Sequence, residues 1–239
     1  MKQIHLHVID STNTYAKEHV AQLASDEITC ISAEGQTAGR GRLGRHWVSP
    51  VGVNIYATFC FQLPAHTLHL TSLALVMASS LATVLIHEGL HPKIKWPNDI
   101  QLHGKKLSGI LCEIQFIQET AQIFLGIGIN VNMEAEHLAS IGQPATSLKI
   151  ETGNVWDKNE FLQKLQNQFT IDLGKFKQHG FAPFHDLYEN LLAYRGETIR
   201  CFDGKKHWEG ICHSITEDGQ LNLYLPNHQM HIISSGDLY

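Results

Sequence analysis

Residues 108–131 read SGILCEIQFIQETAQIFLGIGINV, and this stretch decides the fold. Two runs, 108–116 and 122–131, are each long enough for a strand, and a few polar residues join them. The pattern therefore predicts an antiparallel β-hairpin. If its turn centres near Glu119, Gly109 lies roughly opposite Asn130, within a residue or two.

The second strand of this hairpin has two different faces. Its odd-numbered positions from 123 to 129 are Ile, Leu, Ile and Ile, whereas Gly126, Gly128 and Asn130 share the other face. Glycines in a strand often mark a place where a ligand or another backbone approaches closely. The pattern predicts a flat platform for a small molecule with Lys106 and Asn130 at one end, although a crossing helix would also need these glycines.

The segment before the hairpin contains a second group of residues that can carry chemistry. Residues 95–99 read KWPND and residues 105–109 read KKLSG. The proline after Trp96 predicts a rigid segment that passes from extended chain into a turn, with Asp99 at the start of the next strand. A strand-ending turn with surface lysines is the simpler alternative.

Residues 35–52 contain several glycines and a proline and show no hydrophobic periodicity, which predicts a loop. Loops longer than about 12–15 residues inside a compact domain tend to be functional. Its centre, residues 39–45, reads GRGRLGR and satisfies the GxGxxG spacing. The dinucleotide and P-loop motifs both require a helix directly afterwards, and the continuation HWVSPVG does not start one.

What remains is a loop in which three arginines alternate with glycines. Guanidinium groups and free backbone N–H groups can close around a phosphate or a carboxylate. A solvated basic turn is again the simpler alternative.

Further elements are expected on both sides. In chain order they are a strand at 3–9, a helix from the N-cap oxygens of Asp10 and Ser11 to about Leu23, a strand at 28–33, a half-buried strand from Val53 to Phe61, and a largely buried helix at 67–88. Asp157 and Glu160 resemble a capping pair that opens a helix closed by Gly180. After Arg195, short alternating strands separated by turn dipeptides predict a small barrel.

The composition predicts a folded intracellular protein. Of 239 residues, 43% are hydrophobic and 17% are charged, which excludes wholesale disorder. The net charge of −5 argues against a generally cationic nucleic-acid surface. Five scattered cysteines without a CxxC pair fit reduced thiols, and the sixteen histidines are too dispersed to predict a metal site. The N-terminus does not resemble a signal peptide, and the most apolar run, Leu73 to Ala78, is far too short for a membrane span, so we expect the cytoplasm.

In this order, the segments resemble the biotin–protein ligase family. The residues that carry the resemblance are Ser11-Thr12-Asn13, GRGRLGR at 39–45 followed by Trp47, KWPND at 95–99, KLSGIL at 106–111 and GIGIN at 126–130. The resemblance implies an α+β fold. A mixed, largely antiparallel sheet flanked by helices, as in class II aminoacyl-tRNA synthetases and biotin ligases, would form a catalytic domain at 1–193. A small SH3-like β-barrel would follow at 194–239.

The resemblance also implies the activity. It is the ATP-dependent biotinylation of a specific lysine on a biotin carboxyl carrier protein, through a biotinyl-5′-AMP intermediate, with biotin and ATP as substrates together with Mg²⁺. The carrier would belong to acetyl-CoA carboxylase. Because the ligand motifs start within the first dozen residues, we expect a monofunctional ligase without the DNA-binding domain that some members carry. Pairing through sheet edges in related enzymes implies a homodimer.

The family's biotin-binding residues transfer to positions in three segments. Ser11, Thr12 and Gln36 would contact the ureido ring of biotin. The complete implied biotin set is Ser11, Thr12, Asn13, Gln36, Arg40, Arg42, Lys106 and Gly109.

The implied catalytic residues are Lys106, Arg42 and Asp99. Lys106, and not Lys105, would bridge the biotin carboxylate and the α-phosphate, with Arg42 close to both. Asp99 would help the carrier lysine to lose its proton or would place magnesium. The implied ATP set is Arg40, Arg42, Arg45, Trp47, Asn98, Lys106 and Asn130.

Two alternatives stay open. A lipoyl ligase or octanoyl transferase is expected to share the fold, but the transferase needs a nucleophilic cysteine. Cys112 is the only candidate near the lysine, and its alternation with Ile110 and Ile114 indicates burial. A non-catalytic biotin sensor would be expected to have lost the equivalent of Lys106 or Arg42, and both are present.

Overall fold

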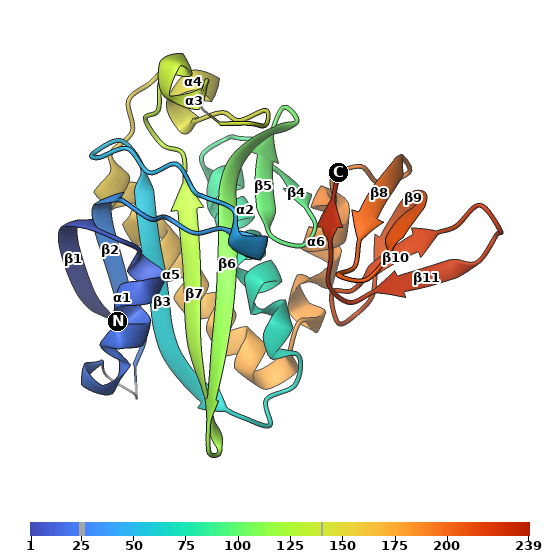
Figure 1. Ribbon diagram of the computed structural model, residues 1–239, viewed down its shortest axis with the longest axis horizontal. Coiled ribbons are helices and arrows are strands. Elements are labelled where there is room, and N and C mark those ends of the chain that lie inside the picture. Colours follow the sequence, from blue (N-terminus) through green and yellow to red (C-terminus); the bar gives the residue numbers. More distant parts are fainter. Residues whose placement is uncertain (24–26, 140) are drawn as a thin grey trace. The chain divides into compact units, whose positions relative to one another are not determined.

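The computed structural model describes residues 1–23, 27–139 and 141–239 (Figure 1). Two compact units make up the chain. The first contains Met1–Leu68 and Gly104–Lys164, and the second contains His69–His103 and Leu165–Tyr239. The domain boundary expected near residue 193 stays a prediction.

The first unit is built on a mixed, largely antiparallel sheet, as predicted. Its strands lie in the order β1 (Lys2–Ile9), β2 (Thr29–Gln36), β3 (Ile55–Pro64), β7 (Thr120–Ile129) and β6 (Lys105–Ile117). Only β1 and β2 run parallel. The predicted hairpin is confirmed as β6 and β7, with Gly109 opposite Gly128, two positions from the expected partner.

Strand β3 is buried along residues 55–61, so the prediction of a half-buried strand is wrong. The side chains at alternate positions, expected to face solvent, are covered and hydrogen-bonded instead. The Tyr56 hydroxyl donates to the Pro50 carbonyl at 2.9 Å, and the Thr58 hydroxyl lies 2.8 Å from Thr12 Oγ1. The loop before β3 and helix α1 (Thr12–Glu18) therefore cover the face that the sequence pattern assigned to water.

Helix α1 begins where the sequence predicts, but its predicted cap is not formed. Ser11 occupies the N-cap position in an extended conformation, and its side chain makes no capping hydrogen bond. Gln36 Oε1 accepts from the Thr12 N–H at 2.9 Å instead, and so satisfies the first helical N–H group from strand β2. The helix ends at Glu18, before the expected Leu23, and a 3₁₀ turn at Val20–Gln22 follows.

The first unit also holds two short helices, α3 (Ala135–Leu138) and α4 (Leu148–Thr152). Helix α5 (Lys158–His179) begins in the first unit and ends in the second. Its predicted cap is confirmed, since Asp157 Oδ1 accepts from the N–H groups of Asn159 and Glu160 at 2.8 and 3.1 Å. Gly180, with φ of 62°, closes the helix as expected.

The second unit contains helices α2 (Leu73–His87) and α6 (His185–Leu191) and the hairpin of β4 (Lys93–Lys95) and β5 (Asp99–Leu102). The helical segment Leu70–His87 is long and apolar enough to span a membrane, but 72% of it is buried inside the protein. It is therefore the buried helix that the sequence predicted over residues 67–88.

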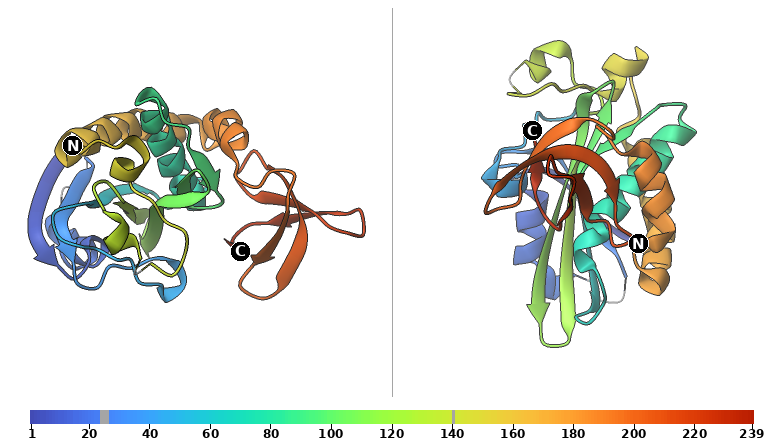
Figure 2. Two further views of the ribbon diagram at one scale, coloured as in Figure 1. Left: turned by 90° about the horizontal axis from the view of Figure 1, so that it is seen from above. Right: turned by 90° about the vertical axis from the view of Figure 1, so that its right-hand side faces the viewer.

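The C-terminal strands form one twisted antiparallel sheet (Figure 2). In spatial order they are β11 (Met230–Ile233), β10 (Leu221–Tyr224), β9 (His207–Ile215), β8 (Thr198–Phe202) and β12 (Asp237–Leu238). Strands β11 and β12 stand at opposite edges, so residues 194–239 form an open sheet where the sequence predicted a closed barrel. The predicted turns at Gly204 and Gly219 are confirmed by their positive φ angles of 94° and 83°.

The Asp218-Gly219 turn packs within the second unit against the KWPND segment and the start of α2. The Trp96 indole N–H donates to the Gly219 carbonyl at 2.9 Å, and the Ser72 hydroxyl donates to the Asp218 carbonyl at 2.8 Å. A Cβ at Gly219 would lie 2.5 Å from Leu75 Cδ2. The turn thus requires glycine both for its backbone conformation and for the space around it.

We predict that Gly219→Ala lowers the free energy of unfolding by about 2 to 4 kcal/mol, because strain at positive φ adds to overpacking against Leu75. Urea unfolding followed by tryptophan fluorescence measures the change. Gly204→Ala is the control, since Gly204 also has positive φ but a Cβ there meets no atom within 4 Å. Equal losses in the two variants would contradict the role of packing.

Candidate functional site

The glycine face of β6 and β7 is covered by two side chains from outside the sheet. A Cβ at Gly126 would overlap Oδ1 of Asn13 on helix α1. A Cβ at Gly128 would lie 2.5 Å from Nε1 of the Trp47 indole, and one at Gly109 would lie 2.9 Å from its Cζ3. A helix residue therefore approaches Gly126, in keeping with the expected alternative of a crossing helix, and a loop residue that was not expected there lies over Gly109 and Gly128. The platform for a small molecule stays a prediction.

A cluster of buried polar side chains lies beside this face. Ser11, Thr12 and Asn13 are each at most 4% exposed. The Thr12 hydroxyl donates to Gln36 Oε1 at 3.2 Å, and the Thr58 hydroxyl lies 2.6 Å from Asn13 Oδ1. Four of the predicted biotin residues, Ser11, Thr12, Asn13 and Gln36, are thus brought together. Thr58, which was not predicted, completes the cluster from strand β3.

The cluster continues into the glycine–arginine loop. Gln36 Nε2 donates to Ser49 Oγ at 3.1 Å, and the Ser49 hydroxyl donates to the Trp47 carbonyl at 2.9 Å. Ser49 was also missing from the predicted site. A polar residue that follows a loop motif has no distinguishing pattern in the sequence, so only the fold identifies it.

The loop itself is a short hairpin. The Trp47 N–H donates to the Gly39 carbonyl at 2.8 Å, and the Gly41 N–H donates to the Arg45 carbonyl at 2.7 Å. A 3₁₀ turn at Arg42–Gly44 forms the tip, with Leu43 at φ of 55°. A Cβ at Gly39 would lie 2.6 Å from the Trp47 carbonyl oxygen, so the base of the hairpin closes only around glycine.

The three arginines of the loop differ in their surroundings. Arg40, at the base, forms an ion pair with Glu113 of strand β6, with 3.0 Å between its Nη2 and Oε2. Arg42 is half-buried and Arg45 is exposed. The ion pair thus places Arg40 beside Asn13 of the polar cluster, because Asn13 binds the same carboxylate.

Glu113 joins the loop to helix α1. Its Oε2 accepts from Asn13 Nδ2 at 2.8 Å, and its Oε1 accepts from Lys17 Nζ at 2.5 Å. Burial alone would raise the pKa of Glu113, but the hydrogen bonds from Lys17 and Asn13 and the charge of Arg40 outweigh it and lower the pKa. The group is therefore ionised at neutral pH. It was not among the predicted site residues, although a lone carboxylate inside the apolar run 110–114 is a signal for it.

Lys106 lies beside the glycine face. Its Nζ is 5.4 Å from the centre of the Trp47 ring, a cation–π distance, and lies 3.3 Å from the position of a Cβ on Gly109. Its main-chain N–H donates to the Pro144 carbonyl at 2.9 Å, which holds the start of β6. Lys106 is half-buried and Lys105 is exposed, in agreement with the choice between them.

Asn130, at the end of β7, is 2% exposed. Its Nδ2 donates to the Thr146 carbonyl at 3.0 Å, and its Oδ1 accepts from Asn54 at 3.5 Å. The side chain therefore fixes the segment around Thr146 in this structure. Its contact with a nucleotide stays a prediction.

Asn98 and Asp99 belong to the second unit. Asp99 is buried and is the first residue of β5, as predicted, where it pairs with Lys95. The Pro97 carbonyl accepts from the Tyr188 hydroxyl of α6 at 3.3 Å. Together with the Trp96–Gly219 bond, this contact fixes the KWPND segment within its own unit.

All five cysteines are free thiols. Cys112 is half-buried, more exposed than its alternation with isoleucines indicated. Burial, with a smaller contribution from the charge of Glu113, raises the pKa of the Cys112 thiol to about 12. The thiolate, which is the nucleophilic form, is therefore scarce at neutral pH.

We predict that Gly128→Ala displaces the Trp47 indole and lowers the free energy of unfolding by about 1 to 3 kcal/mol, because the added methyl overlaps the ring. A shift in tryptophan emission together with a urea unfolding curve tests this. Gly142→Ala is the control, because a Cβ there meets no atom within 4 Å. An unchanged emission spectrum in Gly128→Ala would show that the ring does not lie on this strand.

Comparison with known proteins gives one consistent family. The model of the biotin/lipoate A/B protein ligase family matches residues 5–130. The bifunctional ligase/repressor BirA of Escherichia coli is 36% identical over 220 residues, which cover 91% of this chain and 68% of BirA. A biotin–[acetyl-CoA-carboxylase] ligase of Paracoccus denitrificans is 33% identical over 223 residues, which cover 91% and 92% of the two chains.

Among solved structures, the biotin protein ligase from Aquifex aeolicus in complex with biotin and ATP superposes with a TM-score of 0.85 at 30% identity, covering 100% of this chain and 98% of that one. The family model, the sequence relatives and the fold thus agree with the motifs. The chain belongs to the biotin/lipoate A/B protein ligase family.

Proposed function

We propose that this protein is a biotin–protein ligase, which joins biotin to AMP at the expense of ATP and then transfers the biotinyl group to a lysine of a carrier domain. The observation that carries the proposal is the position of Lys106 beside a glycine face whose other border is a buried cluster of hydrogen-bonding side chains. Relatives named as biotin ligases and a related structure that contains biotin and ATP support the same substrates.

The polar cluster suits the ureido ring of biotin. That ring has two N–H donors and one carbonyl acceptor, so its site needs both kinds of partner. The hydroxyls of Ser11, Thr12 and Thr58 can donate or accept, and the amide of Gln36 does both. Apolar sheet and indole surface beside these groups suits the remainder of a small, mostly apolar vitamin.

The first step brings two anions together. A carboxylate oxygen of biotin attacks the α-phosphorus of ATP, an O–P bond forms, and pyrophosphate leaves with the electron pair of the broken bond. No protein nucleophile is needed. Lys106 and Arg42 would offset the charge that develops on the α-phosphoryl oxygens, and fixed cations in a partly dehydrated site do this well.

The second step transfers the biotinyl group. The carrier lysine attacks the acyl carbon of biotinyl-AMP, AMP leaves, and an amide forms with loss of one proton from the amine. Asp99 would accept that proton or place a metal ion. The mixed anhydride must meet the amine before it meets water, and the arginine hairpin over the sheet would exclude water during the interval.

Magnesium would accompany the ATP. In the part of the chain that the structure describes, no three side chains of His, Cys, Asp or Glu gather around one point. We therefore propose that phosphate and water oxygens would supply most of the ligands of the ion. We assign it no step.

The partner in the second step would be a biotin carboxyl carrier domain, in keeping with the acetyl-CoA carboxylase in the names of two relatives. We further propose a cytoplasmic enzyme, since the one helix among the described residues that is both long and apolar enough to span a membrane is a core helix. A homodimer through a sheet edge is also proposed.

The family name includes lipoate, which makes a lipoyl or octanoyl enzyme the second candidate. The raised pKa of Cys112 disfavours an octanoyl transferase. Pyrophosphate release from ATP, measured with biotin, lipoate and octanoate in turn, tests the proposal. Release with biotin alone supports it, and release with either of the other acids but not with biotin overturns it.

We predict that Lys106→Ala lowers the rate of biotinyl-AMP formation by a factor on the order of 100 or more while biotin still binds, because one fixed cation at the reacting oxygens is lost. Single-turnover pyrophosphate release and biotin titration give the two quantities. Lys105→Ala is the control and should behave like the parent, since Lys105 is exposed. A normal rate in Lys106→Ala would remove the role assigned to this lysine.

We predict that Arg42→Gly shortens the time for which the enzyme retains biotinyl-AMP by about tenfold or more, because a charge-assisted contact to the intermediate is lost. Gel filtration of enzyme loaded with labelled adenylate measures the retention. Arg200→Gly, an exposed arginine on strand β8, should retain the adenylate like the parent. Equal retention in all three proteins would contradict the prediction.

A further inference from the structure

The base of the arginine hairpin is attached to the sheet at two points. Trp47 lies over Gly109 and Gly128, and Arg40 pairs with Glu113. Arg40 and His46 form the bridge next to the Gly39–Trp47 pair, so both attachments lie at the base of the hairpin and not at its tip. Leu43, at the tip, is 68% exposed.

Glu113 makes the polar one of these two attachments. Its carboxylate receives hydrogen bonds from Arg40 of the loop at 3.0 Å, from Lys17 of α1 at 2.5 Å and from Asn13 of α1 at 2.8 Å. The carboxylate is 24% exposed, and two cations share its single negative charge. A carboxylate with three donors from two segments holds these segments to one strand.

The same carboxylate orients the amide of Asn13. Because Nδ2 of Asn13 donates to Glu113, its Oδ1 is left to lie over Gly126 and to accept from Thr58 at 2.6 Å. Glu113 therefore acts on the polar cluster as well as on the loop.

These contacts continue into a closed ring. In order, the linked residues are Arg40, Glu113, Asn13, Thr58, Thr12, Gln36, Ser49 and Trp47. The main chain from Arg40 to Trp47 closes the ring, and that segment is the hairpin. The two ends of the hairpin base are thus connected through the polar cluster itself.

We propose that Glu113 is a positioning residue that clamps the base of the arginine hairpin to strand β6 and so keeps Trp47 over the glycine face. Its effect on the adenylate rests on the proposed function, whereas its effect on the loop does not. Biotin and nucleotide need not touch Glu113 for the clamp to operate. It acts through Arg40 and Asn13.

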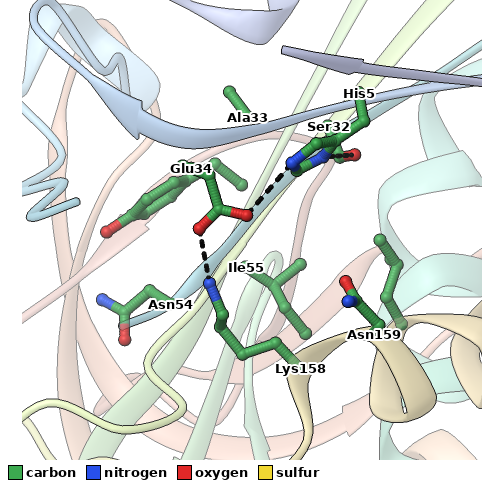
Figure 3. Close-up of a pocket in the computed structure, with 10 residues that line it drawn as sticks. His5, Ser32, Ala33, Glu34, Asn54, Ile55, Lys158 and Asn159 are labelled. Carbon is green, nitrogen blue, oxygen red and sulfur yellow. Dashed lines mark hydrogen bonds and ion pairs between the residues drawn. The ribbon is translucent and has the colours of Figure 1, made fainter. Parts of the chain in front are cut away.

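A second carboxylate provides a matched control. Oε2 of Glu34 on strand β2 accepts a hydrogen bond from Lys158 Nζ at 2.7 Å, and its Oε1 lies 3.0 Å from His5 Nε2 (Figure 3). It points toward α5, on the face opposite to Ile31, which packs against Ala16 of α1. Glu34 has similar side-chain exposure, at 28%, and its carboxylate pairs with a lysine as Glu113 does, but its two charged partners, Lys158 and His5, both lie outside the hairpin 39–47.

The first experiment measures the loop without any ligand. Trypsin cleaves after arginine, so the rate of cutting at Arg40, Arg42 and Arg45 reports how often the hairpin opens. Glu113→Gln should be cut about two- to fivefold faster than the parent, the range expected for loss of a partly exposed ion pair. Glu34→Gln should be cut at these bonds at the parent rate. A parental rate in Glu113→Gln would overturn the clamp.

A second variant removes the same contact from its exposed partner. Arg40→Gln should raise the cutting rate at Arg42 and Arg45 as Glu113→Gln does, and the double variant should add little to either, because both changes break one interaction. Full additivity would show that the two residues act separately and would overturn the proposal. Glu113→Asp, which keeps the charge, should recover part of the protection, which a purely steric role would not give.

The last experiment measures the intermediate. Glu113→Gln should release biotinyl-AMP into solution several-fold faster than the parent, with a smaller change in the KM for biotin, whereas Glu34→Gln should match the parent. If the parent releases no pyrophosphate with biotin, the proposed function is wrong, and the rates of trypsin cleavage still test whether Glu113 holds the hairpin. If the parent is active and Glu113→Gln retains the adenylate normally, the clamp has no part in the reaction and the proposal fails.

Discussion

The site depends on a surface from which side chains must be absent. Gly109, Gly126 and Gly128 leave the backbone of two paired strands bare, and the indole of Trp47 and the amide of Asn13 come within contact distance of it. A methyl group at Gly126 or Gly128 would push one of these groups away. The polar cluster, the hairpin and Lys106 are arranged around this bare strip, so each of them takes its position from the glycines.

Several charged side chains lie near this glycine strip. The hairpin, helix α1 and the start of β6 supply cations, and Glu113 pairs with two of them, Arg40 of the hairpin and Lys17 of α1. Because two cations meet its one negative charge, Glu113 would detract little from the anion site that we propose around Lys106 and Arg42. Lys106 lies beside the glycine strip, and Arg42 lies nearer the tip of the hairpin.

The sequence alone predicted the parts of the site that have a local pattern. The hairpin of β6 and β7, the loop at 39–45 and the strand that starts at Asp99 all follow from periodicity, glycine and proline. Glu113, Thr58 and Ser49 were not found, because their roles arise from strands and loops that are distant in the chain. The burial of β3 was mispredicted for a related reason: hydroxyl groups on its second face satisfy one another beneath α1 and the preceding loop, whereas a pattern of alternating polarity assigns them to water.

The hydrogen bond between the Trp96 indole and the Gly219 carbonyl has a consequence for proteins that are assembled from parts of related chains. Trp96 lies in the KWPND segment and Gly219 in a turn more than a hundred residues later. The acceptor is a main-chain carbonyl, so the bond depends on where the backbone of that turn lies. A chimaera that takes its last strands from a diverged relative would keep this bond only if the new turn brings a carbonyl to the same place. If the turn is displaced, the buried Trp96 indole is left without its acceptor.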